Sequence, residues 1–179
     1  MKHRRQPIKI IELLAVMAFL LVINLPVEAS VQLPNPSFDE DAANIGTPDG
    51  WVIHPKASVS LVTDKVSHGA KAAKFTEGYV LLSCDMNEEN IAGLKLEGSI
   101  DAAGSDGAKL GIMFGFNIQQ DGKTKFIYSR PVWDRKLEGN YQKITFACKI
   151  PDNAVKQRIW FGVYRSNSTG TVWLDNAAI

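Results

Sequence analysis

Short runs of alternating hydrophobic and polar residues dominate the chain after residue 30, and Gly, Asn, Asp and Pro separate them. Alternation with a period of two is typical of β-strands, and no segment there keeps the i, i+3, i+4, i+7 spacing of an amphipathic helix. The runs that predict strands are residues 58–63, 71–76, 79–86, 94–102, 109–119, 124–131, 141–150, 157–165 and 171–179. The pattern therefore predicts an all-β fold, a two-sheet β-sandwich of the jelly-roll type.

The run over residues 111–118 shows how alternation assigns faces. Ile112, Phe114 and Phe116 share one side, which predicts that this side packs between the two sheets. The opposite side is rich in glycine, an arrangement that suits a flat ligand lying along the sheet and also suits an ordinary surface. Asp121 and Gly122 follow, and they predict a hairpin turn because both residues accept the positive φ that a tight turn needs.

The first thirty residues follow a different pattern. A cationic head precedes an apolar run over residues 13–23, which ends near Pro26, and small residues stand at Val27 and Ala29. This order predicts a signal peptide over residues 1–29, cleaved after Ala29. The alternative is a retained membrane anchor, but the run is shorter than the ~20 apolar residues that a spanning helix needs. Cleavage leaves residues 30–179 as one β-sandwich domain, and we expect it to be secreted or periplasmic.

Charge limits the class of partner. The chain has 20 Lys and Arg residues against 19 Asp and Glu residues. Removing the leader, with its four basic and two acidic residues, leaves 16 basic and 17 acidic side chains. This balance argues against a nucleic-acid partner and against an anionic membrane surface, because both need a concentrated basic face.

Both cysteines, Cys84 and Cys148, lie in the exported part of the chain. An oxidising compartment favours a disulfide between them. The alternative is a pair of buried free thiols, since unpaired cysteine is among the most buried residue types.

Motifs at both ends of the domain add a resemblance. They are Asn-Pro-Ser-Phe-Asp at 35–39, Gly-Trp at 50–51, Val-Ser-His-Gly-Ala-Lys at 66–71 and Val-Trp-Leu-Asp-Asn at 172–176. In order and spacing they resemble the carbohydrate-binding modules found beside bacterial cellulases and xylanases, which are galactose-binding-domain-like jelly rolls. The resemblance covers nearly all of residues 33–179. It implies carbohydrate binding, and it implies a structural calcium held by Asp39, by backbone carbonyls around Ser67 and Lys71, and by Asp175, a donor set of the kind that calcium accepts.

A sugar site in such a domain combines aromatic rings, which stack on the apolar face of a pyranose, with side chains that hydrogen-bond its hydroxyl groups. The candidates for these roles are Trp133, Trp160, Tyr164, Tyr128, Asn117 and Arg130. Trp133 is expected in a loop after Pro131, where it would be exposed. The alternative for each aromatic residue is core packing.

Catalysis has weaker support. Neither His54 nor His68 has a recognisable nucleophile partner, and no spacing singles out a pair of carboxylates for glycoside hydrolysis. The sequence therefore predicts an exported carbohydrate-binding protein that is not an enzyme. Two alternatives stay open, a protein-interaction or structural β-sandwich of the envelope or extracellular space, and a small glycan-acting hydrolase.

Overall fold

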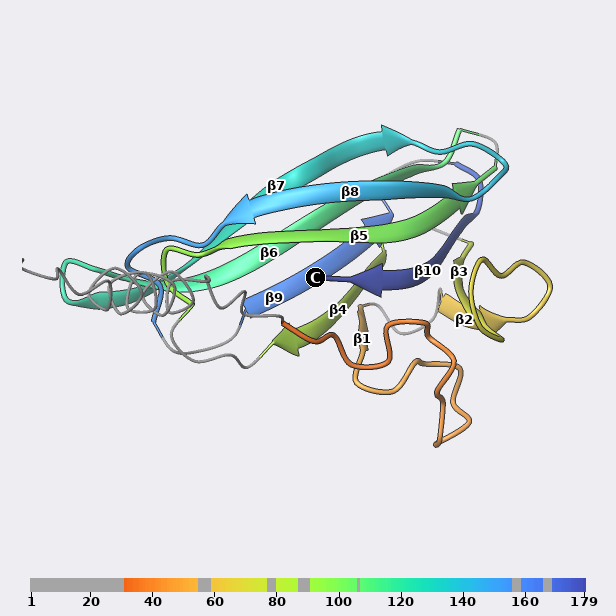
Figure 1. Ribbon diagram of the computed structural model, residues 1–179, viewed down its shortest axis with the longest axis horizontal. Coiled ribbons are helices and arrows are strands. Elements are labelled where there is room, and N and C mark those ends of the chain that lie inside the picture. The colour runs from red at the N-terminus through yellow and green to blue at the C-terminus, as the bar shows by residue number, and fades with distance from the viewer. Residues whose placement is uncertain are drawn as a thin grey trace, which may run out of the picture. The chain divides into compact units, whose positions relative to one another are not determined.

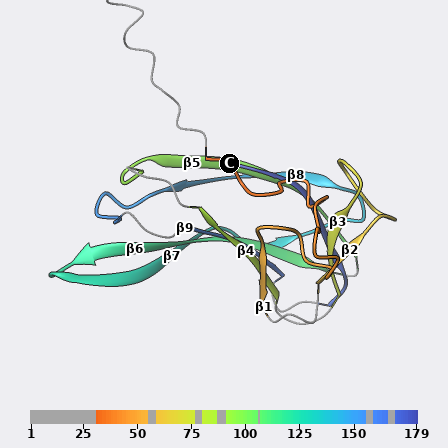
Figure 2. The ribbon, with the colours of Figure 1, turned by 90° about the horizontal axis from the view of Figure 1, so that it is seen from below.

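A computed structural model describes residues 31–54, 59–76, 80–86, 91–105, 107–155, 159–165 and 169–179; for residue 86 and residues 159–164 it describes the backbone alone. The ten strands in these ranges form two sheets, in the orders β1-β4-β9-β6-β7 (the first sheet) and β2-β3-β10-β5-β8 (the second sheet). Figure 1 shows the strands along the sandwich, and Figure 2 shows the sheets as two layers. The strands are β1 (Val52–His54), β2 (Val59–Val62), β3 (Ala72–Phe75), β4 (Val80–Met86), β5 (Lys95–Gly104), β6 (Lys109–Gln120), β7 (Lys123–Lys136), β8 (Gln142–Lys149), β9 (Ile159–Arg165) and β10 (Val172–Ala178).

The predicted two-sheet sandwich is confirmed, and each of the nine predicted strands corresponds to an observed one. Two details differ. Strand β1 was not predicted, because three residues are too few to show an alternating pattern. Strand β7 continues five residues beyond the predicted end at Pro131. In the described residues, no helix is long and apolar enough to cross a membrane.

The core lies between the inner faces of the two sheets. Ile112, Phe114 and Phe116 of β6 are buried, as their alternation predicts. The Phe114 ring meets Phe146 of β8 with centroids 5.7 Å apart and a tilt of 54°, so one aromatic contact joins the two sheets. Burying side chains of this size supplies about 1.5–3 kcal/mol each, which makes this layer the main source of stability.

Strands β6 and β7 form the longest hairpin of the first sheet. Asp121 and Gly122 form its turn with φ values of 52° and 71°, which confirms the predicted turn. The hairpin end reaches beyond β5 and β8 of the other layer (Figure 2). Ile127 of the edge strand β7 is 36% exposed although it faces the inner side, whereas Phe116 and Ile118 of β6 are buried on that side.

Two bulges interrupt the β6–β7 ladder. Ser129 lies opposite Phe114, whereas Val132 lies opposite Ile112, so three residue steps of β7 face two steps of β6. A second shift of the same kind follows before Leu110. Each bulge adds a residue to one strand and re-aims the side chains that follow it. The bulges therefore change which β7 residues share a face.

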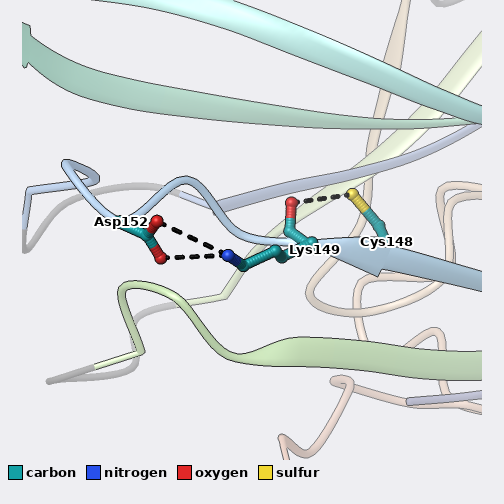
Figure 3. A network of polar contacts seen from close by, with 3 residues as sticks. All are labelled: Cys148, Lys149 and Asp152. Carbon is teal, nitrogen blue, oxygen red and sulfur yellow. Dashed lines mark hydrogen bonds and ion pairs between the residues drawn. The ribbon is translucent and has the colours of Figure 1, made fainter.

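The predicted disulfide is absent: Cys84 in β4 and Cys148 in β8 are both buried free thiols. The Cys148 thiol contacts the Lys149 carbonyl (3.6 Å; Figure 3) and hydrogen-bonds with Ser129 of β7. Strands β7 and β4 are three strand spacings apart in the first sheet, about 14 Å. Cys148 faces β7 across the core, so its distance from Cys84 in β4 is of this order. That distance exceeds the ~7 Å that a disulfide allows between Cα atoms, and the two thiols therefore cannot pair.

Candidate functional site

The outer face of the first sheet contains the predicted sugar-binding positions. Directly opposed residues of an antiparallel pair lie on the same side of a sheet. Gly115 lies opposite Tyr128 of β7 on one side and opposite Trp160 of β9 on the other. Asn117, two residues further along β6, lies opposite Phe126. Phe114, Phe116 and Ile118, which alternate with Gly115 and Asn117 in β6, are buried in the core. Gly115, Asn117 and the residues opposite them therefore lie on the outer face.

Arg130 and Trp133 join the same face because of the bulge between them. The guanidinium carbon of Arg130 lies 4.6 Å from the centroid of the Tyr128 ring and 4.2 Å from that of the Trp133 ring. Tyr128 and Trp133 are 55% and 51% exposed, and Phe126 beside them is 55% exposed. We call Phe126, Tyr128, Arg130 and Trp133 the β7 strip. Trp133 was predicted in a loop; it lies within β7, and its exposure comes from the edge position of the strand.

The β9 candidates are placed by backbone alone. Trp160 lies opposite Gly115, and Tyr164 lies opposite Gly111. Their register positions therefore fall in the rows of the outer face, two strand spacings from β7, while their side chains lie outside the described part of the chain. Asn117 is half-buried. The structure thus brings Tyr128, Arg130 and Trp133 into contact and places the other three candidates in register on the same sheet.

A second cluster lies at the turn between β2 and β3. The backbone N–H groups of Ser67 and His68 donate to Asp175 Oδ2 (2.7 and 2.8 Å), and that of Asn176 donates to Asp175 Oδ1 (2.7 Å). The N–H groups of Ala70 and Lys71 at the same turn donate to Asp39 Oδ1 (both 2.7 Å). The four positions implied for a metal, Asp39, Ser67, Lys71 and Asp175, are therefore brought together.

The two carboxylates of this cluster have different environments. Burial raises the pKa of Asp39, but the hydrogen bonds from the Ala70 and Lys71 N–H groups outweigh it, so the pKa lies below its usual value. Burial raises the pKa of Asp175 above its usual value despite its three N–H donors, and the charge of Asp39 adds to the rise. A cation beside both carboxylates would relieve that repulsion.

The residues of the turn cluster fit a calcium ion in donor chemistry. The donors are oxygens of two carboxylates and of backbone carbonyls, which calcium accepts. In the described ranges, no group of three or more His, Cys, Asp and Glu side chains converges. The carbonyls near Ser67 and Lys71 would therefore have to supply much of the coordination.

Two hollows in the described part of the surface lie away from the β7 strip. One of about 390 Å³ is lined by residues that include Leu33, Pro36 and Ile179. Another of about 410 Å³ lies over Gly98 and Phe146 of the second sheet. The β7 strip is an exposed edge of a sheet, so a ligand there would lie across an open surface.

No family model matches this chain, and no curated protein matches it in sequence. Solved structures match it in three dimensions. Family 16 Carbohydrate Binding Module-2 superposes with a TM-score of 0.57 and 12% identity over 75% of this chain and 95% of that one. The CBM22-1 xylan-binding domain from Paenibacillus barcinonensis Xyn10C gives a TM-score of 0.59 and 16% identity over 79% and 88% of the two chains. TmCBM61, solved with β-1,4-galactotriose, gives 0.56 and 16% over 84% and 97%.

This chain has the fold of a carbohydrate-binding module. The superpositions cover nearly all of each of these three neighbours. They confirm the architecture that the motifs at the two ends of the domain implied. At identities of 12–16%, the likeness concerns the fold.

Sequence reasoning missed two features of the β7 strip. Phe126 was not proposed as a binding residue, although its alternation with Tyr128 and Arg130 was visible. The bulge that brings Trp133 onto the face of Arg130 contains Pro131, which strands accept at bulges. Asp134 belongs to the second bulge, where its φ of 49° is a left-handed conformation that Asp tolerates better than most residues.

Proposed function

We propose that the protein is an exported, non-catalytic carbohydrate-binding protein that holds a poly- or oligosaccharide on the outer face of the first sheet. The observation that carries this proposal is the β7 strip, in which two exposed aromatic rings flank an arginine on the open face of a carbohydrate-binding-module fold. Tyr128 and Trp133 would stack on pyranose rings, and Asn117 and Arg130 would hydrogen-bond hydroxyl groups. Trp160 and Tyr164 would extend the surface from β9.

The chemistry of the strip favours binding over hydrolysis. A glycosidase needs two carboxylates flanking the scissile bond, at about 5–9.5 Å from each other. On this face the described carboxylates are Asp134, which pairs with Lys109 (3.8 Å), and Asp85 of β4, which lies three strands from β7. Three strand spacings amount to about 14 Å, which is too far for a catalytic pair.

The test is a glycan array followed by titration of each binding glycan. Trp133→Ala should lower affinity about 5- to 150-fold, because stacking on an exposed ring is worth on the order of 1–3 kcal/mol by analogy with base stacking. Trp133→Phe keeps a ring and should retain most of the affinity. Ile45→Ala is the matched control, since Ile45 is an exposed apolar residue (72%) in the segment before β1. Array silence from folded protein, or equal binding by all variants, would remove the strip from the proposal.

A protein-interaction role is the second candidate, because β7 is an edge strand with three consecutive exposed apolar residues, Phe126, Ile127 and Tyr128. Exposed edges can pair with strands of other chains. Here Pro131 and the two bulges interrupt the edge, and both features hinder strand addition. A partner captured from native extract, lost in a Phe126→Lys variant and accompanied by a silent array, would favour this role.

Calcium is proposed as a structural ion at the turn cluster. Asp39, Asp175 and the backbone carbonyls around Ser67 and Lys71 would hold it, and it would neutralise the two carboxylates there. Calcium should raise the melting temperature of the protein, and a chelator should reverse the change. Asp39→Asn should abolish the calcium response. An unchanged melting curve across millimolar calcium would count against the ion.

A further inference from the structure

The hairpin that carries the β7 strip is basic in a chain that is nearly neutral. Residues 109–136 contain six Lys and Arg residues and two Asp residues, whereas the whole chain has a net charge of +1. The excess of four positive charges on this hairpin is therefore offset by an acidic remainder. A local charge of this kind, placed around exposed aromatic rings, bears on which ligands the face accepts.

Arg130 is the charge at the centre of the strip. Its guanidinium carbon lies over both the Tyr128 and the Trp133 ring, and the residue is exposed. In the described part of the chain, the ion pairs are Lys95–Glu97, Lys109–Asp134 and Lys149–Asp152, so none of them neutralises Arg130. The nearest carboxylate along β7, that of Asp134, already pairs with Lys109.

The two rings restrict where this guanidinium can lie. A planar guanidinium offers paired N–H donors that match the two oxygens of a carboxylate or sulfate, and ring stacking leaves those edge N–H groups available. An arginine that served only neutral hydroxyl groups would leave its charge uncompensated when a ligand excluded water from the strip. A ligand with an anionic group would compensate it.

We infer that the glycan held by the β7 strip is anionic, with a carboxylate or sulfate group that pairs with Arg130 while neighbouring sugar rings stack on Tyr128 and Trp133. This inference rests on the proposed function and names its substrate class. The carboxylate of a uronic acid and a sulfate ester share the same recognition chemistry, and the experiment distinguishes them.

Nucleic acids are the other large class of anionic polymers that this face could meet. A nucleic acid needs a broad basic surface, which a chain with a net charge of +1 does not supply. The face therefore fits an acidic saccharide better.

The experiment measures affinity for matched pairs of polymers. The pairs are polygalacturonate with its carboxyl-reduced form, and a sulfated galactan with its desulfated form; a single-stranded oligonucleotide is included. The protein should bind the acidic member of at least one pair about tenfold more tightly, and the preference should weaken as salt rises. Preference in the first pair alone identifies a carboxylate ligand, and preference in the second alone identifies a sulfate ligand.

Two variants separate a specific pairing from general charge. Arg130→Gln should abolish the preference, so that the acidic and the neutral polymer of each pair bind with equal affinity. Lys125→Gln removes the same charge from the other face of β7, where Lys125 contacts Gln120, and should preserve the preference. Equal loss in both variants, or tighter binding of the oligonucleotide, overturns the inference. Equal affinity within both pairs also overturns it while glycan binding stands, whereas no binding to any glycan, with the fold intact by circular dichroism, refutes the proposed function itself.

Discussion

Asp175 provides the sharpest test of how the turn cluster is held together. The side chain is fully buried, and it accepts three backbone N–H groups at 2.7–2.8 Å. Two of these donors, Ser67 and His68, are more than 100 positions away in sequence. Asp175→Ala removes all three acceptor contacts at once and leaves the donors without replacement.

The expected cost follows from the contacts. A hydrogen bond to a charged group contributes about 1.5–3 kcal/mol, and a buried donor left unpaired costs about 1–3 kcal/mol. Burial already penalises the Asp175 carboxylate, as its raised pKa indicates, and this offsets part of the gain. We therefore expect Asp175→Ala to lower the free energy of unfolding by roughly 3–5 kcal/mol. For a domain of this size that corresponds to a fall in Tm of roughly 6–20 °C.

The assay is urea unfolding followed by tryptophan fluorescence, in chelator so that only the hydrogen bonds are measured. Asp175→Asn keeps one acceptor oxygen for Ser67 and His68 but turns an amide N–H₂ toward Asn176, so its cost should be intermediate. Asp152→Ala is the control, because its carboxylate pairs with Lys149 at an exposed site (Figure 3), where such pairs contribute little. A loss below about 1 kcal/mol in Asp175→Ala, equal to the control, would refute the reasoning.

Two further predictions concern backbone geometry and alkaline stability. Gly69 and Gly122 both have a φ of 71°, but a Cβ at Gly69 would lie 2.1 Å from Asp39 Oδ2, whereas one at Gly122 would meet nothing within 4 Å. In chemical denaturation, Gly122→Ala should therefore cost about 1 kcal/mol for its backbone alone and Gly69→Ala clearly more; equal costs would contradict the predicted clash. Burial, with the Asp85 charge, raises the pKa of Cys84 from 9.0 to about 12, so the unfolded state releases the thiol proton first as pH rises. Stability should fall by up to about 1.4 kcal/mol per pH unit between these values, and Cys84→Ala, followed over the same pH range, should remove that part of the slope.

Local pattern predicted most of the fold. Alternation located nine strands, and it assigned Phe114 and Phe116 to the core because a one-residue slip would expose them. The Asp121–Gly122 turn was predictable because its chemistry is local. The meeting of Asp39 and Asp175 at one turn came from the end motifs, since no local pattern connects residues so far apart.

The features that sequence reasoning missed depend on three-dimensional placement. Whether Cys84 and Cys148 can pair depends on which strands face each other across the sandwich. The disulfide prediction rested on the redox state of the compartment, which says nothing about strand positions. The bulge before Trp133 depends on how β7 pairs with β6, so a strict period of two ends the predicted strand at Pro131. The contact of Arg130 with the rings of Tyr128 and Trp133 depends on that bulge, so it could not be predicted from the sequence either.

The position of β10 has a consequence for when the domain can fold. It lies in the middle of the second sheet, between β3 and β5, although it is the last strand in sequence. The segment at Pro36 also accepts a hydrogen bond from the Ala177 N–H (2.8 Å). During synthesis, β3 and β5 therefore have no central partner until the ribosome has added residues 172–178, and such non-local pairing slows folding. The second sheet therefore gains its central strand only after residues 172–178 have been synthesised, which makes its completion a late step of folding.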